Sequence, residues 1–317
     1  KKEGIRDSRG TLFQTIATIL ARHQPTYFVL ENVKRLLLME QGSHFATILS
    51  VLADLDYWIE WRLLNAMHFG LPQNRQRVFL IGVHRNKYPS HGSPPIRLAT
   101  KEDLSELSGN RLDELLHPAD WKGIAEHGQR IPAWGIASQG RFFAATLSTF
   151  SERSPLTPLR SVLETEVSSD FDFTESTLER LKGSKPVMRY IDGVEILSNQ
   201  SGGARMGYTV FGIDGVAPTL TATTSRHYER YKVGERYRRL TNTEYARIQG
   251  FPDDHCKAVS VHDQYGLIGN AVPPRMADWV LKKLLGDGSY ATAPSRPRPG
   301  AERCGVVKTA QCSPVSR

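Results

Sequence analysis

The chain has few cysteines and no long apolar run. Its three cysteines, Cys256, Cys304 and Cys312, include no Cys-x-x-Cys pair. An odd, widely spaced set argues against a disulfide framework and favours a reducing, cytoplasmic compartment. The histidines do not cluster with the cysteines at zinc-ligand spacing, so we expect no metal site. No stretch approaches the roughly 20 apolar residues of a membrane span, and no apolar leader marks a secretory signal, so we expect no membrane association.

The chain also lacks an excess of acidic residues. It carries 41 Lys and Arg against 33 Asp and Glu, which gives a formal charge of +8 over 317 residues. A modest positive excess favours a polyanionic partner such as nucleic acid, although many proteins without such a partner are equally basic. The length allows two domains. The first residue is Lys1 and not methionine, so we expect the chain to start inside a longer coding frame.

The first 85 residues alternate between helical and strand patterns. Apolar spacing predicts helices over 11–22 and 42–55, and apolar runs predict strands over 27–30, 57–64 and 78–83. This order is typical of an open α/β sheet. Ligands of such sheets lie outside the carboxyl ends of the strands, where Glu31 and Asn32 follow the first strand.

The composition changes after Arg85. Residues 86–235 are rich in proline, glycine and serine and predict a separate, irregular domain. Helical patterns return at 241–249 and 273–285, and the remainder lacks apolar periodicity and is expected to be disordered. The predicted organisation has four parts: a catalytic half over 1–85, an irregular domain over 86–238, a return to the catalytic domain over 239–285, and a tail over 286–317.

Four short motifs carry the chemistry. Glu31-Asn32-Val33 ends a buried strand, where burial raises a carboxyl pKa and suits a proton donor, although a strand-end Glu can also simply cap a helix. Arg75 and Arg77 occupy alternate positions of an extended segment, so we expect both guanidiniums on the same side. Such a pair can bind a phosphate or a carbonyl. The alternative is that both arginines are solvated in a loop. The stretches 239–252 and 265–274 carry Gly-Phe-Pro and Gly-Asn turns.

In this order the motifs resemble the cytosine-C5 DNA methyltransferase family. The Glu-Asn-Val strand end resembles motif VI, Gln-x-Arg-x-Arg motif VIII, Arg-x-Gln-Gly-Phe-Pro motif IX and Gly-Asn-Ala-Val-Pro-Pro motif X. Residues 7–13 resemble motif V. The resemblance implies a partial Rossmann-like methyltransferase sheet, a target recognition domain, and a bacterial restriction–modification context with S-adenosylmethionine and double-stranded DNA as ligands.

The resemblance assigns roles to individual residues. A cysteine thiolate adds to C6 of cytosine, C5 then accepts the methyl group, and the cysteine leaves. Glu31 is expected to hydrogen-bond or protonate N3 of the base, and Arg77 to hold O2. Arg75 is expected to shape this pocket and Asn32 to support the nucleophile loop. The target base must leave the duplex to reach the site.

Further residues are assigned to the cofactor and to DNA. Leu12 is expected to line the adenine pocket, with Asn270 and Val272 closing it. Thr219 and Leu220 match the Thr-Leu element of the recognition domain. The basic stretch from Arg226 to Arg239 is interleaved with tyrosines; as contacts to phosphates and bases we predict Thr219, Leu220, Arg226, Arg230 and Lys232. An exposed basic strand is the alternative interpretation of that stretch.

Two family elements do not occur in this sequence. No Phe-x-Gly-x-Gly loop is present, and no cysteine follows proline. Three explanations stay open: a truncated enzyme, one subunit of a split enzyme completed by an N-terminal polypeptide, or a degenerate relative that binds DNA without catalysis. In each case we expect inactivity of the isolated chain and an unpaired sheet edge. One branch of the family methylates tRNA, but the long 86–238 segment argues against it.

Overall fold

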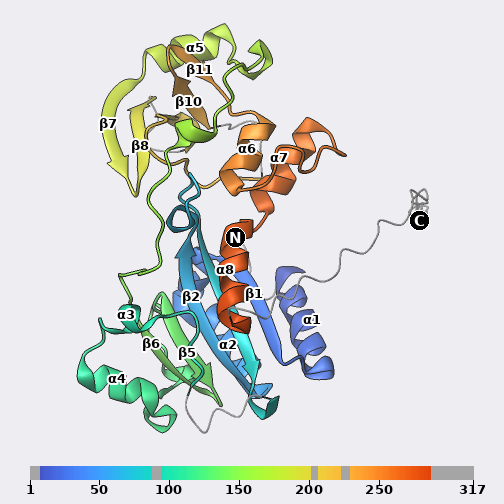
Figure 1. The fold of residues 1–317 in the computed structure, drawn as a ribbon, viewed down its shortest axis with the longest axis vertical. Coiled ribbons are helices and arrows are strands. Elements are labelled where there is room, and N and C mark those ends of the chain that lie inside the picture. The colour runs from blue at the N-terminus through green and yellow to red at the C-terminus, as the bar shows by residue number, and fades with distance from the viewer. Residues whose placement is uncertain (1–7, 88–93, 201–205, 223–228, 287–317) are drawn as a thin grey trace, which may run out of the picture.

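A computed structural model describes residues 8–87, 94–200, 206–222 and 229–286. Two sheets lie towards opposite ends of the long axis (Figure 1). The first contains β1 (Tyr27–Val33), β2 (Tyr57–Asn65), β3 (Gln76–His84), β4 (Lys122–Gly123), β5 (Trp134–Ser138) and β6 (Arg141–Ala145). The second contains β7 (Lys185–Ile191), β8 (Val194–Asn199), β9 (Thr209–Phe211), β10 (Arg230–Val233) and β11 (Arg236–Arg238).

Eight α-helices accompany the two sheets in the described residues. They are α1 (Ser8–His23), α2 (Ser43–Asp54), α3 (Lys101–Leu104), α4 (Gly109–Leu116), α5 (Glu175–Lys182), α6 (Asn242–Gln249), α7 (Val261–Asn270) and α8 (Pro274–Leu285). Thr241 caps α6 through a reciprocal capping box with Glu244, which satisfies two backbone N–H groups at the helix start. The helix therefore begins where the sequence predicted it.

The first sheet has the strand order β1-β3-β2-β5-β6-β4, and every neighbouring pair is antiparallel. Because β3 lies antiparallel between β1 and β2, those two strands end at the edge where β3 begins. This arrangement gathers Glu31, Asn65 and Arg77 at one edge of the sheet. β1 is the terminal strand, and among the described residues it pairs only with β3.

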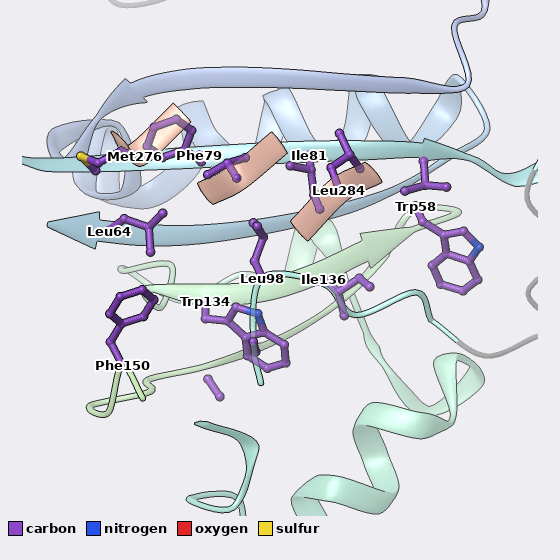
Figure 2. Packing of buried hydrophobic residues seen from close by; sticks show 14 of the residues in the cluster. Trp58, Leu64, Phe79, Ile81, Leu98, Trp134, Ile136, Phe150, Met276 and Leu284 are labelled. Carbon is purple, nitrogen blue, oxygen red and sulfur yellow. The ribbon is translucent and has the colours of Figure 1, made fainter. Parts of the chain in front are cut away.

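The two faces of the first sheet are buried by different elements. One face packs against α8 and the 94–150 region: Met276 and Leu284 meet Phe79 and Ile81, with Trp134 alongside (Figure 2). The other face packs against α1 and α2. Burial of apolar side chains on both faces, at about 25 cal/mol per Å² of apolar area, holds the strands in place.

The stretch Lys34–Asp54 is long and apolar enough to cross a membrane by length and composition. The apolar runs of the sequence did not indicate it. It consists of the 3-10 segment η2 (Lys34–Gly42) and α2, interrupted at Glu40 and Gln41, which have positive φ. Phe45 and Leu49 of α2 are fully buried against the sheet. The α2 part of this stretch is therefore a core helix of the fold.

The mixed α/β architecture predicted from the sequence is confirmed. β5 hydrogen-bonds to β2, so the first sheet draws strands from both sides of residue 85, where the sequence predicted a domain boundary. The domain boundaries themselves stay predictions. The helix α7, over Val261–Asn270, was not predicted, since glycine at 266 and 269 weakens its helical pattern.

Candidate active site

The β2–β3 connection is fixed by its own hydrogen bonds. Asn65 accepts from the Arg75 N–H at 3.0 Å, and its amide donates to Asn74 Oδ1 at 2.9 Å. The Ala66 N–H donates to the Arg75 carbonyl at 3.0 Å. These bonds satisfy the polar groups of a largely buried loop, as burial requires. They hold Arg75 and Arg77 at the sheet edge where β1 ends.

Glu31 and Arg77 form an ion pair at this edge. Arg77 Nε lies 2.9 Å from Glu31 Oε1, and the two side chains are 12% and 24% exposed. Burial raises the pKa of Glu31 above its ordinary value, against the opposing charges of Arg77 and Arg75. Burial also lowers the pKa of Arg77, which Glu31 partly offsets. The carboxyl therefore takes up a proton more readily than an exposed glutamate.

Arg75 lies close to this pair but has different partners. It is 1% exposed, and its Nη atoms donate to the carbonyls of Leu220 at 3.2 Å, Gly269 at 3.0 Å and Ala271 at 2.9 Å. Burial lowers its pKa to about 10. Its Nε is buried without a partner among the described residues. The two guanidiniums expected to act together are thus committed to different groups.

A cleft of about 430 Å³ opens between the first sheet's edge and the second sheet. It is lined by Val33, Lys34, Arg35, Asn74, Gln76, Arg77, Ile191, Asp192, Val194, Ile196, Pro218 and Thr219. Three of its lining side chains are cationic: Lys34, Arg35 and Arg77. Asn32 is exposed beside it, and its Oδ1 accepts from the Val33 N–H at 2.8 Å. A cleft of this charge suits a polyanion.

The Thr-Leu element borders this cleft through Thr219. Thr219 Oγ1 donates to the Asn74 carbonyl at 2.6 Å. Leu220 is buried in the third apolar cluster, and its N–H donates to Gln73 Oε1 at 3.1 Å. Thr219 therefore lines the cleft with Arg77, whereas Leu220 contributes packing and backbone groups.

The predicted basic contacts lie elsewhere on the second sheet. On β10, Arg230 donates to the Gly207 carbonyl, and Lys232 pairs with Glu235 at 3.6 Å. Neither lines the 430 Å³ cleft, and Arg226 lies outside the described residues. Tyr231 of the same stretch is fully buried. The basic stretch therefore contains both core residues, such as Tyr231, and surface residues, such as Lys232.

The three predicted cofactor residues are not gathered into one pocket. Leu12 is 62% exposed on α1, beside residues that pack on one face of the sheet. Asn270 is exposed at the end of α7, and Val272 packs against the opposite face. None of the three lines the 430 Å³ cleft. These three side chains therefore do not by themselves enclose a nucleoside.

Sequence reasoning missed two buried glutamines of the site. Gln73 Nε2 donates to Gln249 Oε1 at 3.0 Å, and Gln249 Nε2 donates to the Ile268 carbonyl at 2.8 Å. Both side chains are fully buried. Each lies inside a quoted motif, but their contact spans 176 residues of chain, and no local pattern encodes it.

The described residues offer neither a metal site nor a Pro-Cys nucleophile. Over 8–87, 94–200, 206–222 and 229–286, no group of three or more His, Cys, Asp or Glu could hold a metal ion. Cys256 is a free thiol in the α6–α7 connection, at a φ of 66°. Cys304 and Cys312 lie outside the described residues.

Comparison with known proteins gives one consistent family. Residues 1–286 match the family described as C-5 cytosine-specific DNA methylase. The Type II methyltransferase M.HpaII of Haemophilus parainfluenzae is 31% identical, over 90% of this chain and 67% of its own length. M.SsoII of Shigella sonnei is 28% identical over 90% of this chain, which spans only 59% of that relative. The S. pombe Dnmt2 methyltransferase structure shares the fold, with a TM-score of 0.52 at 15% identity, covering 90% of this chain and 73% of that one.

Proposed function

This chain belongs to the C-5 cytosine-specific DNA methylase family, and from that premise we propose that it binds the target cytosine and the surrounding duplex during C5 methylation of a specific DNA sequence. In this family S-adenosylmethionine supplies the methyl group. The observation that carries the proposal is the Glu31–Arg77 pair beside a cationic cleft. The chain's own contribution is to hold the base and move a proton at N3.

The chemistry of the pair matches cytosine. C5 is a poor nucleophile until a thiolate adds to C6, and this addition pushes electron density onto N3 and O2. A protonated Glu31 can donate to N3, and burial raises its pKa in that direction. Arg77 can donate to O2 as negative charge develops there. Asn32 lies next to Glu31 in the chain and, as the resemblance implies, would support the nucleophile loop.

The nucleophile must come from another segment. No cysteine of this sequence follows proline, so we propose that a complementary N-terminal polypeptide segment, covalently attached or separate, supplies it. The edge of β1 that no strand of the described residues pairs supports this arrangement. A strand added there would lie about 4.8 Å from β1 and, running parallel to it, would end beside Glu31.

The cleft supports duplex DNA as the substrate. Lys34 and Arg35 can neutralise phosphates, and Thr219 lines the same space. A base that leaves the stack would enter this cleft to reach Glu31. Arg230 and Lys232, on the second sheet, are proposed to extend the phosphate contact away from the cleft.

Methyl transfer from labelled S-adenosylmethionine tests this proposal. The chain is mixed with the polypeptide that carries the Pro-Cys loop and is given duplex DNA or tRNA. We expect label at cytosine C5 of the duplex, and none from the chain alone. Duplex binding with no transfer in the mixture would favour a DNA-binding subunit without chemistry. Preferential labelling of tRNA would contradict the assignment of the substrate.

A further inference from the structure

The side chains of Gln73 and Arg75 hold both the backbone at Leu220 and the end of α7. Gln73 accepts from the Leu220 N–H at 3.1 Å, and Arg75 donates to the Leu220 carbonyl at 3.2 Å. Both polar groups of a single peptide residue are therefore bound by one loop. Since the same residue follows Thr219, this loop fixes the wall of the cleft.

The same two side chains also reach the end of α7. Arg75 donates to the carbonyls of Gly269 and Ala271, and Gln73 reaches the Ile268 carbonyl through Gln249. These carbonyls lie at the helix end, where intrahelical donors run out. The turn that carries Asn270 and Val272 is thus tied to the loop at three points.

The two tied segments also touch each other. A Cβ at Gly269 would lie 2.5 Å from the Thr221 carbonyl oxygen and 2.9 Å from the Ala222 nitrogen. Glycine is therefore required where the helix end packs directly on the backbone of the Thr-Leu segment. Neither segment can shift towards the other without a clash, or away from it without breaking buried hydrogen bonds.

We propose that Gln73 and Arg75 are positioning residues that couple the segment 218–222 to the turn between α7 and α8. Duplex binding at 218–222 and an ordered α7–α8 turn then favour each other. The inference deepens the proposed function and rests on it for the identity of the ligand. Arg75 is assigned to this coupling and not to the base, because it does not line the cleft and both of its Nη atoms are committed to backbone carbonyls.

Burial makes the coupling effective. Gln73 and Gln249 are fully buried, and Arg75 is 1% exposed, so a displaced partner cannot be replaced by bulk water. Movement of Leu220 would break its hydrogen bonds to Gln73 and Arg75. The two side chains could then shift and lose their hydrogen bonds, made through Gln249 in the case of Gln73, to the carbonyls at the end of α7. By linkage, the free energy by which order at one segment favours order at the other is the same in both directions.

Amide hydrogen exchange of the full chain tests the coupling without any ligand. We expect the amides of 217–222 and 266–272 to open as one unit, with the same dependence on urea. In Gln73→Met, exchange at both segments should speed up by at least about fivefold, and their urea dependences should separate. Arg75→Lys and Gln249→Met provide the same test if the first variant folds poorly.

Gln264→Met is the matched control, because Gln264 is a buried glutamine of α7 bonded to Asn242 and to the Val259 carbonyl, outside the coupled set. It should leave 217–222 unchanged. Independent opening of the two segments in the unmodified chain would overturn the proposal, as would a Gln73 variant that affects only one of them.

A second arm adds a random-sequence duplex pool. Binding should slow exchange at both segments in the unmodified chain, but only at 217–222 in Gln73→Met. Slowing confined to 217–222 in the unmodified chain would contradict the coupling. If no duplex binds, the proposed function fails, and the ligand-free measurement still decides whether the segments are coupled.

Discussion

Arg77 meets Glu31 diagonally across the β1–β3 pair, with Nε 2.9 Å from Oε1. Arg77 stands opposite Val33, two residues beyond Glu31, so the two side chains project from the same face of the sheet. Strand register therefore brings together a carboxyl and a guanidinium that are 46 positions apart in the chain. Both side chains are partly shielded from water, and Arg77 also lines the cleft.

Glu31→Gln should abolish most methyl transfer in the completed enzyme while sparing DNA affinity. The amide still hydrogen-bonds but cannot deliver a proton to N3, and general acid catalysis typically contributes about 10²–10⁴-fold. The measurement is the single-turnover rate of labelled methyl transfer, beside a duplex-binding titration. Asp56→Asn is the control, since Asp56 pairs with Arg85 at 3.3 Å, at the opposite end of β3. Equal loss in both variants would contradict the role of Glu31.

Arg35→Gln should weaken duplex binding in a salt-dependent manner. Arg35 lines the cationic wall of the cleft, and removing one phosphate-binding cation should reduce the slope of log affinity against log salt by about one. Binding is measured by fluorescence anisotropy over a range of salt concentrations. Lys101→Gln, an exposed charge on α3 that does not line the cleft, should leave the slope unchanged. An unchanged slope in Arg35→Gln would place the DNA elsewhere.

Local patterns predicted the helices and strands of the first 85 residues well. The strand and helix over 57–65 and 43–54 have strong, uninterrupted periodicity, and the structure has them within one or two residues of the predicted bounds. The contents of 86–238 were not predictable in this way. β7 to β11 are short or exposed strands, and β5 joins the first sheet only through pairing with β2, a contact across some 70 residues.

For the site residues too, local sequence patterns predicted some features, and contacts between distant residues determined the others. Glu31 and Arg77 could be proposed from the motif series. The antiparallel pairing of β1 with β3 places the end of one strand beside the start of the other, and so brings the two side chains together. The contacts of Arg75 could not be predicted from the sequence, since its partners are carbonyls near positions 220 and 270. Any residue there would offer the same carbonyl, so the sequence carries no signal of the contact.

Stability should fall as pH rises through the range of Glu60. This side chain is 2% exposed, and burial raises its pKa from 4.5 to about 7, against hydrogen bonds from Trp134, Leu98 and Arg97. The folded state therefore binds the proton more tightly than the unfolded state. The favourable contribution is complete below pH 4.5 and is lost as pH rises through 7, a change of about 3 kcal/mol.

Urea unfolding of the chain at a series of pH values measures this contribution. Glu60→Gln should remove that part of the pH dependence, because an amide does not titrate. Glu235→Gln, whose side chain is 98% exposed, should leave the profile unchanged. A profile that is the same with and without Glu60 would show that its carboxylate is already fully stabilised by its N–H donors.

Gly82→Ala should destabilise the pairing of β3 with β1. A Cβ at Gly82 would lie 1.9 Å from Phe28 Cε1, so the Phe28 ring must move out of the core, at a cost of about 1–3 kcal/mol. The free energy of unfolding in urea measures it, and Phe28→Leu in the same chain should recover part of the loss. Gly109→Ala, with nothing within 4 Å on α4, should be neutral or slightly stabilising. Equal effects at both glycines would contradict the packing argument.

Trapping with 5-fluorocytosine tests most directly the claim that this chain binds the base while another segment attacks it. A base must remove the C5 proton before the cysteine can leave, and fluorine at C5 cannot be removed in this way. The sulfur–C6 bond therefore persists after methyl transfer, and mass spectrometry can identify the cysteine that forms it. In a mixture of the chain, the Pro-Cys polypeptide, S-adenosylmethionine and fluorinated duplex, we predict an adduct on the Pro-Cys cysteine that Glu31→Gln suppresses. An adduct on Cys256, or one that forms in full without this chain, would contradict the account.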